Sequence, residues 1–232
     1  MRYFAGLALL IMTVAPSMAE KTLTVGTTGD YEPVTWFDPA RGDYVGEDID
    51  LVRAFAAAEG YRVTFVRTTW ATLIDDLLAG KFEMAVGGIS KTAARAKLTL
   101  PSDPIATSGK VALVRCGEEA KYASLAAIDQ PATRVIENRG GTNQPFALAE
   151  IERAVIILVP DNSMAFDYLE NDRADVMFTD SIEAIYHQEQ REGLCAVNPD
   201  NPYTHVEKVF LFGKDEVALR DTFNVWLASR EK

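Results

Sequence analysis

Two carboxylates, Asp180 and Glu183, stand where an apolar run gives way to a helical pattern. The run covers 175–178 and predicts a buried strand, and the helical pattern continues through Ile182 and Ile185. In open parallel α/β sheets, ligands bind at the carboxyl ends of the strands. Both acids are therefore placed to meet a ligand, and a carboxyl group that burial keeps protonated can act there as a general acid.

The same spacing also has a purely structural interpretation. In a capping box the first side chain caps a helix, and the fourth residue reaches back to the amide of the capping residue. Asp180 and Glu183 match that pattern too. The choice between the two interpretations depends on the segments that surround these acids.

A carboxylate-binding segment is indicated after a second expected strand, 84–86. Gly88 and Ser90 follow this strand, and Arg95 comes shortly after them. An arginine fork with short hydroxyl donors suits a carboxylate held by two hydrogen bonds. The alternative is a surface arginine on a helical turn, because most arginines are exposed.

A glycine-containing segment, 138–143, lies between a strand and a helical stretch over 144–150. Glycines let backbone amides approach an anion at a helix N-terminus, so Asn138, Thr142 and Asn143 are candidate ligand contacts. A plain turn with Thr142 as the helix cap is the alternative. The segment lacks the G-x-G-x-x-G and Walker spacings, which argues against nucleotide binding.

Three aromatic residues, Tyr31, Trp36 and Trp70, lie near the expected sheet edges. Such side chains can cover the apolar ring of a ligand and exclude water from it. Core packing is the alternative role for at least one of them.

These residues are positioned by short apolar runs that alternate with amphipathic stretches, a pattern that predicts βαβ units and parallel sheets. The expected elements are 23–27, 49–59, 62–66, 70–78, 84–86, 134–137, 155–159 and 176–178, followed by an amphipathic stretch over 217–227. When the two halves of the sequence are aligned with Lys81 opposite Arg173, a helix, a tight turn and a strand match between them. Gly88 then aligns with Asp180. We therefore expect two similar lobes with the ligand between them, and crossings over 108–114 and 204–212.

The N-terminus predicts export. Arg2 precedes the apolar run 5–14, and a cleavage site with small residues follows and ends at Ala19. This order is typical of a cleavable signal peptide, and the apolar run is too short to span a membrane. The 232 residues carry a formal net charge of −11, which gives no support for a nucleic-acid or anionic-membrane surface. His187 and His205 form no H-E-x-x-H motif, so a catalytic metal or a Ser-His-Asp triad is poorly supported.

The sequence has two cysteines, Cys116 and Cys195. An exported compartment permits a disulfide between them, and the even count favours one. Two buried free thiols are the alternative, because sequence fixes no geometry. The spacing matches no zinc motif.

Together, four motifs resemble the periplasmic cyclohexadienyl dehydratases, also called prephenate or arogenate dehydratases. This group is itself similar to amino-acid-binding proteins of transport systems. The motifs are Gly26-Thr27-Thr28-Gly29-Asp30-Tyr31-x-Pro33, Gly87-Gly88-Ile89-Ser90-x4-Arg95, Gly140-Gly141-Thr142-Asn143 and Thr179-Asp180-x-Ile182-Glu183-Ala184. The resemblance runs from about Thr22 to Leu227 and includes the segment 127–131 and both cysteines.

The resemblance implies roles for individual residues. Arg95, with the hydroxyls of Ser90 and Thr142, would hold a ligand α-carboxylate, and Asp180 would hold an α-amino group. The dehydratases carry a glutamate at the position of Glu183, where transport binders usually have a small or apolar residue. Two further positions that match the dehydratases more than the binders are Asn138 and Asn143.

The resemblance also implies a two-lobed α/β fold of the periplasmic-binding-protein (Venus flytrap) type, each lobe a mostly parallel sheet flanked by helices. We expect a signal peptide over 1–19, a discontinuous first lobe over 20–112 and 205–232, and a second lobe over 113–204. Both families usually continue past the last helix with a glycine-containing turn and an aromatic-ended segment. This chain stops at Lys232, so some contacts that close the first lobe are expected to be missing.

The expected function is the decarboxylating dehydration of prephenate to phenylpyruvate, and of L-arogenate to L-phenylalanine, in the periplasm and without a cofactor or metal. The alternatives are a non-enzymatic amino-acid-binding protein of an ABC transport system and a sensor module that presents a ligand to a membrane partner. Glu183 favours the enzyme. The sequence leaves open the preference between prephenate and arogenate, and whether the protein is a homo-oligomer.

Overall fold

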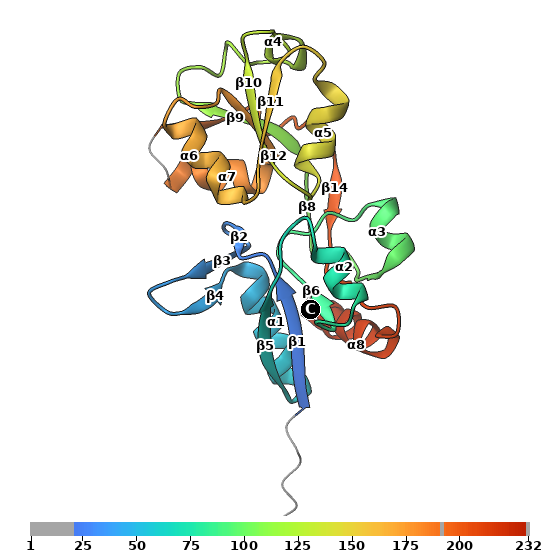
Figure 1. Cartoon of the computed structure of the whole chain (residues 1–232). Helices are drawn as coiled ribbons and strands as arrows, with labels where there is room; N and C mark the ends of the chain where they lie inside the picture. Colours follow the sequence, from blue (N-terminus) through green and yellow to red (C-terminus); the bar gives the residue numbers. More distant parts are fainter. Residues whose placement is uncertain (1–20, 191–192, 231–232) are drawn as a thin grey trace, which may run out of the picture.

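The computed structural model describes residues 21–190 and 193–230, so the expected signal peptide lies outside the described residues. The chain folds into two lobes, and the strand pair β8 (Ala106–Ser108) and β14 (Val206–Lys208) runs between them (Figure 1). Each lobe holds a five-stranded sheet with helices packed against it. The expected two-lobed α/β fold is confirmed. Every helix within the described residues is too short or too polar to span a membrane.

The sheet of the first lobe has the strand order β5-β1-β6-β15-β7. Its first three strands are parallel, and β15 runs antiparallel to both of its neighbours. The strands are β1 (Lys21–Thr27), β5 (Tyr61–Arg67), β6 (Met84–Ala85), β7 (Leu100–Pro101) and β15 (Leu211–Phe212). The helices are α1 (Glu47–Glu59), α2 (Leu73–Leu78), α3 (Ala93–Leu98) and α8 (Val217–Ser229).

The first lobe also carries a small antiparallel sheet that the sequence did not predict. It comprises β2 (Asp30–Tyr31), β3 (Thr35–Asp38) and β4 (Asp43–Val45). In Figure 1 this sheet lies at the side of the first lobe that faces the second, and β2 contacts α6 there. Tyr31 is thereby carried to the gap between the lobes.

The sheet of the second lobe has the order β11-β10-β12-β9-β13. β11, β10 and β12 are parallel, and β9 runs antiparallel to both β12 and β13. The strands are β9 (Lys110–Arg115), β10 (Arg134–Asn138), β11 (Val155–Val159), β12 (Val176–Asp180) and β13 (Leu194–Val197). The helices are α4 (Leu125–Ile128), α5 (Asn143–Glu150), α6 (Asn162–Glu170) and α7 (Ser181–Gln190).

Both faces of the second sheet are covered by apolar side chains. Along β9, Val111 and Leu113 pack into one core cluster, whereas Ala112 and Val114 pack into another on the opposite face. Side chains alternate between the two faces of a strand, so a strand buried on both sides is apolar throughout. This explains why the strands of this lobe appear in the sequence as continuous apolar runs.

The chain leaves the first lobe through β8 and returns through β14, and the two strands pair antiparallel. β9 already belongs to the second sheet and begins at Lys110. The expected boundary at residue 113 falls inside this strand, because a charged residue is a poor signal for the start of a buried strand. We propose that the second lobe begins at Lys110.

The internal repeat has a structural counterpart. In each lobe a helix and tight turn lead into a strand, α2 into β6 and α6 into β12, as the alignment of the two halves predicts. Glu83 accepts a hydrogen bond from the backbone N–H of Thr24 at 2.8 Å, and Asp175 accepts one from the backbone N–H of Arg134 at 2.8 Å. Matching acids therefore tie matching strands together, which supports an internal duplication.

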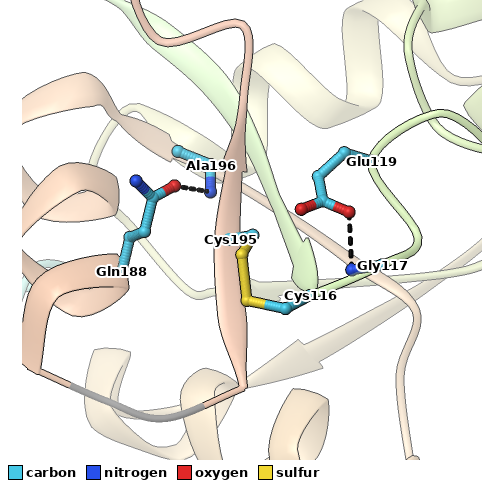
Figure 2. Close-up of a disulfide and its surroundings, with 6 residues drawn as sticks. All are labelled: Cys116, Gly117, Glu119, Gln188, Cys195 and Ala196. Atoms are coloured by element: carbon cyan, nitrogen blue, oxygen red, sulfur yellow. Dashed lines mark hydrogen bonds between the residues drawn. A yellow bond between two sulfur atoms is a disulfide. The ribbon is translucent and has the colours of Figure 1, made fainter.

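The structure joins Cys116 and Cys195 in a disulfide (Figure 2). Cys116 directly follows β9 and Cys195 lies in β13, so the bond links two neighbouring strands of the second sheet. Close to it in Figure 2, the Gln188 side chain of α7 accepts a hydrogen bond from the backbone N–H of Ala196 at 2.9 Å. Glu119 lies near both sulfurs, but because they are bonded to each other they offer no thiolate to a metal.

Candidate active site

A small cavity lies between the lobes. Its wall consists of Tyr31, Trp70, Gly88, Ser90, Arg95, Asn138, Gly141, Thr142, Asn143, Asn162 and Asp180. The structure thus brings together all the candidate contacts named from the sequence except Trp36, and adds Gly141 and Asn162. The candidate general acid, Glu183, is not part of the wall; its buried side chain lies behind Asn162.

The first lobe supplies a positive group to the cavity. Arg95 belongs to α3, whose N-cap residue Thr92 accepts a hydrogen bond from the Arg95 backbone N–H at 3.2 Å. The guanidinium donates through Nη1 to the Ser90 backbone carbonyl at 2.8 Å, which fixes its position. Burial lowers the pKa of Arg95 to about 10, with Asp180 opposing this shift, so the group stays charged at neutral pH. A five-donor fork held in this way suits a ligand carboxylate.

The carboxylate of Asp180 is occupied by protein groups. Oδ1 accepts a hydrogen bond from Lys110 Nζ at 3.0 Å, and Oδ2 accepts from Lys208 Nζ at 2.5 Å and from the Tyr31 hydroxyl at 2.9 Å. Burial alone would raise the pKa of Asp180, but the charges of Lys110 and Lys208 outweigh burial and hold that pKa well below its usual range. Asp180 is therefore ionised at neutral pH.

Glu183, on the first turn of α7, has no such cations. Its Oε1 accepts a hydrogen bond from Asn162 Nδ2 at 2.7 Å, and its Oε2 accepts from the Thr179 hydroxyl. Burial raises the pKa of Glu183 to about 8; the Thr179 hydrogen bond opposes the shift, and the charges of Asp180 and Asp30 reinforce it. The carboxyl is therefore protonated at neutral pH. Its partners are side chains rather than the Asp180 amide, which argues against the capping box.

Asn162 connects Glu183 to the cavity and the two lobes to each other. Its backbone N–H donates to the Asp30 carboxylate at 3.2 Å, and its Nδ2 donates to the Asp30 backbone carbonyl at 3.0 Å. Asp30 belongs to the first lobe and Asn162 to the second, so these bonds hold the lobes together. Within the described residues the buried Asn162 Oδ1 accepts no hydrogen bond. Leaving a buried acceptor unpaired costs about 1–3 kcal/mol, which a ligand donor would offset.

Aromatic rings and a close backbone contact seal the cavity. The rings of Tyr31 and Trp70 meet edge to face with centroids 6.0 Å apart, and the Trp70 indole N–H donates to Asp30 at 2.9 Å. Gly140 of the second lobe packs against the backbone of Trp70 and Ala71, where a Cβ would come within 2.4 Å of the Ala71 nitrogen. Gly140 also has a positive φ of 78°. This contact between the lobes therefore requires glycine.

The end of β10 and the segment after it contribute the side-chain amides of Asn138 and Asn143 to the cavity wall. Asn143 Nδ2 donates to Asn138 Oδ1 at 3.3 Å, and the Asn143 side-chain oxygen accepts from Lys110. Thr142 occupies the N-cap position of α5, but its side chain makes no capping hydrogen bond. This argues against the plain-turn alternative, in which the Thr142 hydroxyl serves the helix.

Trp36, expected near the site, lies elsewhere. It lines a separate hollow together with Arg67 and Asp161. The reason is the hairpin that the sequence did not reveal: Trp36 sits on β3 opposite Asp30, one strand further from the cavity than Tyr31. The aromatic side chains that line the cavity are therefore those of Tyr31 and Trp70.

Lys110, Lys208 and Asn162 were not anticipated from the sequence. Each lysine directly precedes an apolar run, and lysine is almost never fully buried unless it is paired. That pattern was an available signal, although it does not identify the partner. Asn162 begins α6 directly after the capping residue Asp161, so it has the appearance of an ordinary helix-start residue.

The model of a known family, bacterial extracellular solute-binding proteins, family 3, matches residues 23–232. The chain belongs to this family. Its cavity between two lobes agrees with binding of a small-molecule solute.

Relatives of two functional kinds share this fold. The chain is 37% identical over 210 residues to cyclohexadienyl dehydratase of Pseudomonas aeruginosa, covering 90% of this chain and 78% of that protein. It is 24% identical over 206 residues to a probable amino-acid ABC transporter-binding protein of Haemophilus influenzae, covering 88% and 77%. The resemblance inferred from the motifs is confirmed by the first of these.

Solved structures give the same picture. An ancestral amino acid-binding protein, a precursor of cyclohexadienyl dehydratase, superposes with a TM-score of 0.84 at 34% identity, covering 90% of this chain and 89% of that one. An ancestral cyclohexadienyl dehydratase superposes with a TM-score of 0.52 at 43% identity, covering 90% and 87%. Binding proteins and dehydratases are thus both structural neighbours of this chain.

Proposed function

We propose that this chain is a cyclohexadienyl dehydratase that converts prephenate to phenylpyruvate. The observation that carries the proposal is the state of Glu183, a carboxyl that is fully buried and protonated at neutral pH, beside a cavity that contains a charged arginine. Similarity to the Pseudomonas aeruginosa dehydratase supports it. A protein that only binds an amino acid has no evident use for such an acid.

The proposed reaction needs one proton and two anchored carboxylates. The Glu183 proton passes to the ring hydroxyl of prephenate, the C–O bond breaks and water leaves. The C–C bond to the ring carboxylate breaks, carbon dioxide leaves, and the electron pair of that bond completes the aromatic ring. Aromatisation supplies the driving force, so the protein contributes orientation, a proton and exclusion of water. Glu183 is then reprotonated from solvent.

In this proposal Glu183 reaches the substrate past Asn162. Asn162 contacts the Glu183 carboxyl at 2.7 Å and also lines the cavity, so only one side chain separates the acid from the ligand space. Catalytic hydrogen bonds often reach their final geometry only when substrate is bound. We propose that Glu183 exchanges its bond to Asn162 for one to the ring hydroxyl, and that Arg95 holds the carboxylate of the pyruvyl side chain.

The test is to incubate the purified protein with prephenate and to follow phenylpyruvate against the spontaneous reaction. The proposal predicts saturable formation of phenylpyruvate that disappears in Glu183→Gln. If prephenate or an amino acid binds but phenylpyruvate forms no faster than without protein, the protein is a solute binder. That result would overturn the enzymatic proposal.

We also propose that the protein acts in the periplasm after removal of residues 1–19. Membership of an extracellular solute-binding family and the apolar N-terminal run support export. N-terminal sequencing of the protein recovered from the periplasmic fraction should begin at Glu20. Recovery of full-length chain from the cytoplasm alone would contradict the proposal.

A further inference from the structure

The side-chain amide of Asn162 has one polar atom left for a ligand. Asn162 begins α6, lies in the cavity wall and is 1% exposed. Its Nδ2 group donates to Glu183 Oε1 at 2.7 Å and to the Asp30 backbone carbonyl at 3.0 Å. A primary amide has two N–H donors and one accepting oxygen. Both donors are therefore used inside the protein, whereas Oδ1 has no hydrogen-bond partner within the described residues.

The two ends of this amide cannot be exchanged. The Asp30 backbone carbonyl only accepts hydrogen bonds, so the amide atom that faces it must be nitrogen. Oδ1 is therefore the free end of the amide. A buried acceptor without a donor costs about 1–3 kcal/mol. The cavity wall thus favours a ligand group that donates a hydrogen bond at Oδ1, and it disfavours a ketone or carboxylate oxygen there.

The carboxyl of Glu183 lies beside the position of that donor. Oδ1 and Nδ2 belong to one planar amide, and Nδ2 contacts Glu183. A ligand group bonded to Oδ1 therefore has an acceptor on one side and a protonated carboxyl on the other. A hydroxyl fits both neighbours, because it has one O–H donor and two lone pairs. An ammonium has donors but no lone pair, so it fits only Oδ1.

We propose that Asn162 Oδ1 accepts a hydrogen bond from the ring hydroxyl of the substrate and turns a lone pair of that oxygen toward Glu183. This inference rests on the proposed function and assigns the binding site of its leaving group. Asn162 forms no covalent bond. The Glu183 proton moves to the hydroxyl oxygen, which departs as water while still bonded to Oδ1. Prephenate and arogenate carry the same ring hydroxyl, so the assignment does not depend on the group at C2.

The first test uses two probes that differ only by a hydroxyl on the ring: 4-hydroxyphenylpyruvate and phenylpyruvate. A site that binds a hydroxyl discriminates against the analogue that lacks it. Calorimetric titration of the wild-type protein should show 4-hydroxyphenylpyruvate binding at least about tenfold more tightly, which corresponds to about 1.4 kcal/mol. Equal binding, which is expected if Oδ1 holds only a water molecule, would overturn the inference, as would binding of neither probe. Neither probe is turned over, so the result is decisive even if the protein proves not to be a dehydratase.

The second test removes the acceptor. In Asn162→Ala the preference for 4-hydroxyphenylpyruvate should fall at least about fivefold. A general weakening of the contact between the lobes would affect both probes alike, so this ratio separates binding of the hydroxyl from a purely structural role.

The matched control is Asn171→Ala, which removes an exposed amide bonded to the Asp167 carbonyl near the other end of α6 and should keep the preference. Asn162→Leu, which nearly keeps the size of the side chain, provides a second variant. An unchanged preference in folded Asn162→Ala and in folded Asn162→Leu would contradict the proposal, and the wild-type comparison decides if neither variant folds.

Discussion

Asp180 and Glu183 are separated by less than one helical turn, are equally buried and have opposite protonation states. Asp180 ends β12 against Lys110 of β9 and Lys208 of β14, and its pKa is held below the usual range. Glu183 lies on α7 among an amide and a hydroxyl, and burial raises its pKa to about 8. The comparison shows that the placement of cations, rather than the depth of burial, decides which acid is charged.

This division of roles follows from topology. Lys110 of β9 and Lys208 of β14 bond to Asp180 at the end of β12, whereas Glu183 in the helix that follows bonds to Asn162 and Thr179. Pairs of acids whose surroundings push their pKa values apart are typical of active sites. Here Asp180 binds Lys110 and Lys208, and Glu183 retains the proton that the proposed reaction requires.

The largest effect is expected for Glu183→Gln. Loss of a general acid typically lowers kcat by about 10²- to 10⁴-fold. Binding should survive, because glutamine is a neutral group of the same shape as the protonated acid. Single-turnover rates and a titration with phenylpyruvate measure the two effects separately. A variant with near-normal turnover would remove Glu183 from the reaction.

Asp180→Asn should instead affect stability most. It leaves Lys110 and Lys208 buried without their counter-charge, and breaking a buried ion pair costs about 3–5 kcal/mol. At neutral pH Glu183→Gln should cost much less, because it replaces one neutral group with another. Urea unfolding of both variants beside the wild type measures the difference. Equal losses would contradict the assigned charge states.

Arg95→Lys tests the cavity wall outside this pair of acids. A lysine loses the two-pronged hydrogen bond to a carboxylate, and hydrogen bonds to charged groups contribute about 1.5–3 kcal/mol. We therefore expect kcat/KM to fall about ten- to a hundredfold while the unfolding midpoint changes little. Arg41→Lys, which alters an exposed arginine paired with Asp38, is the control. If both variants retain full kcat/KM, Arg95 does not bind the substrate.

A further prediction concerns the dependence of stability on pH. Between the ordinary glutamate pKa of 4.5 and about 8, the folded protein keeps a Glu183 proton that the unfolded chain has lost. Stability should therefore fall as pH rises through this window, by up to about 1.4 kcal/mol per pH unit. Asp180 acts in the opposite direction, because its stabilising contribution is lost as pH falls below its ordinary value of 3.8. Parallel pH curves for wild type and Glu183→Gln would contradict the account.

The fold and most of the cavity wall could be predicted from the sequence because both follow from local patterns. Alternation of apolar runs and amphipathic stretches locates the parallel strands, and the loops beyond these strands must then meet. Gly88, Ser90, Arg95 and Asp180 were found in this way. The resemblance to the dehydratases favoured the proposed role of Glu183 as a general acid over that of a helix cap, which the spacing alone fits equally well.

The charge relationships could not be predicted, because they depend on contacts between segments far apart in the chain. Lys110 and Lys208 approach Asp180 only when β9 and β14 pack beside β12. Asn162 at the start of α6 meets Glu183 at the start of α7. The assignment of Asp180 to a ligand ammonium was made without these lysines, and it stays a prediction.

The most direct test of the central claim is the pH dependence of the chemical step, measured in single turnovers of prephenate between about pH 6 and pH 10. If Glu183 is the general acid, the rate should be constant at low pH and fall about tenfold per pH unit above a pKa of about 8. A rate that stays constant through this range, or that rises with pH, would show that Glu183 does not donate the proton.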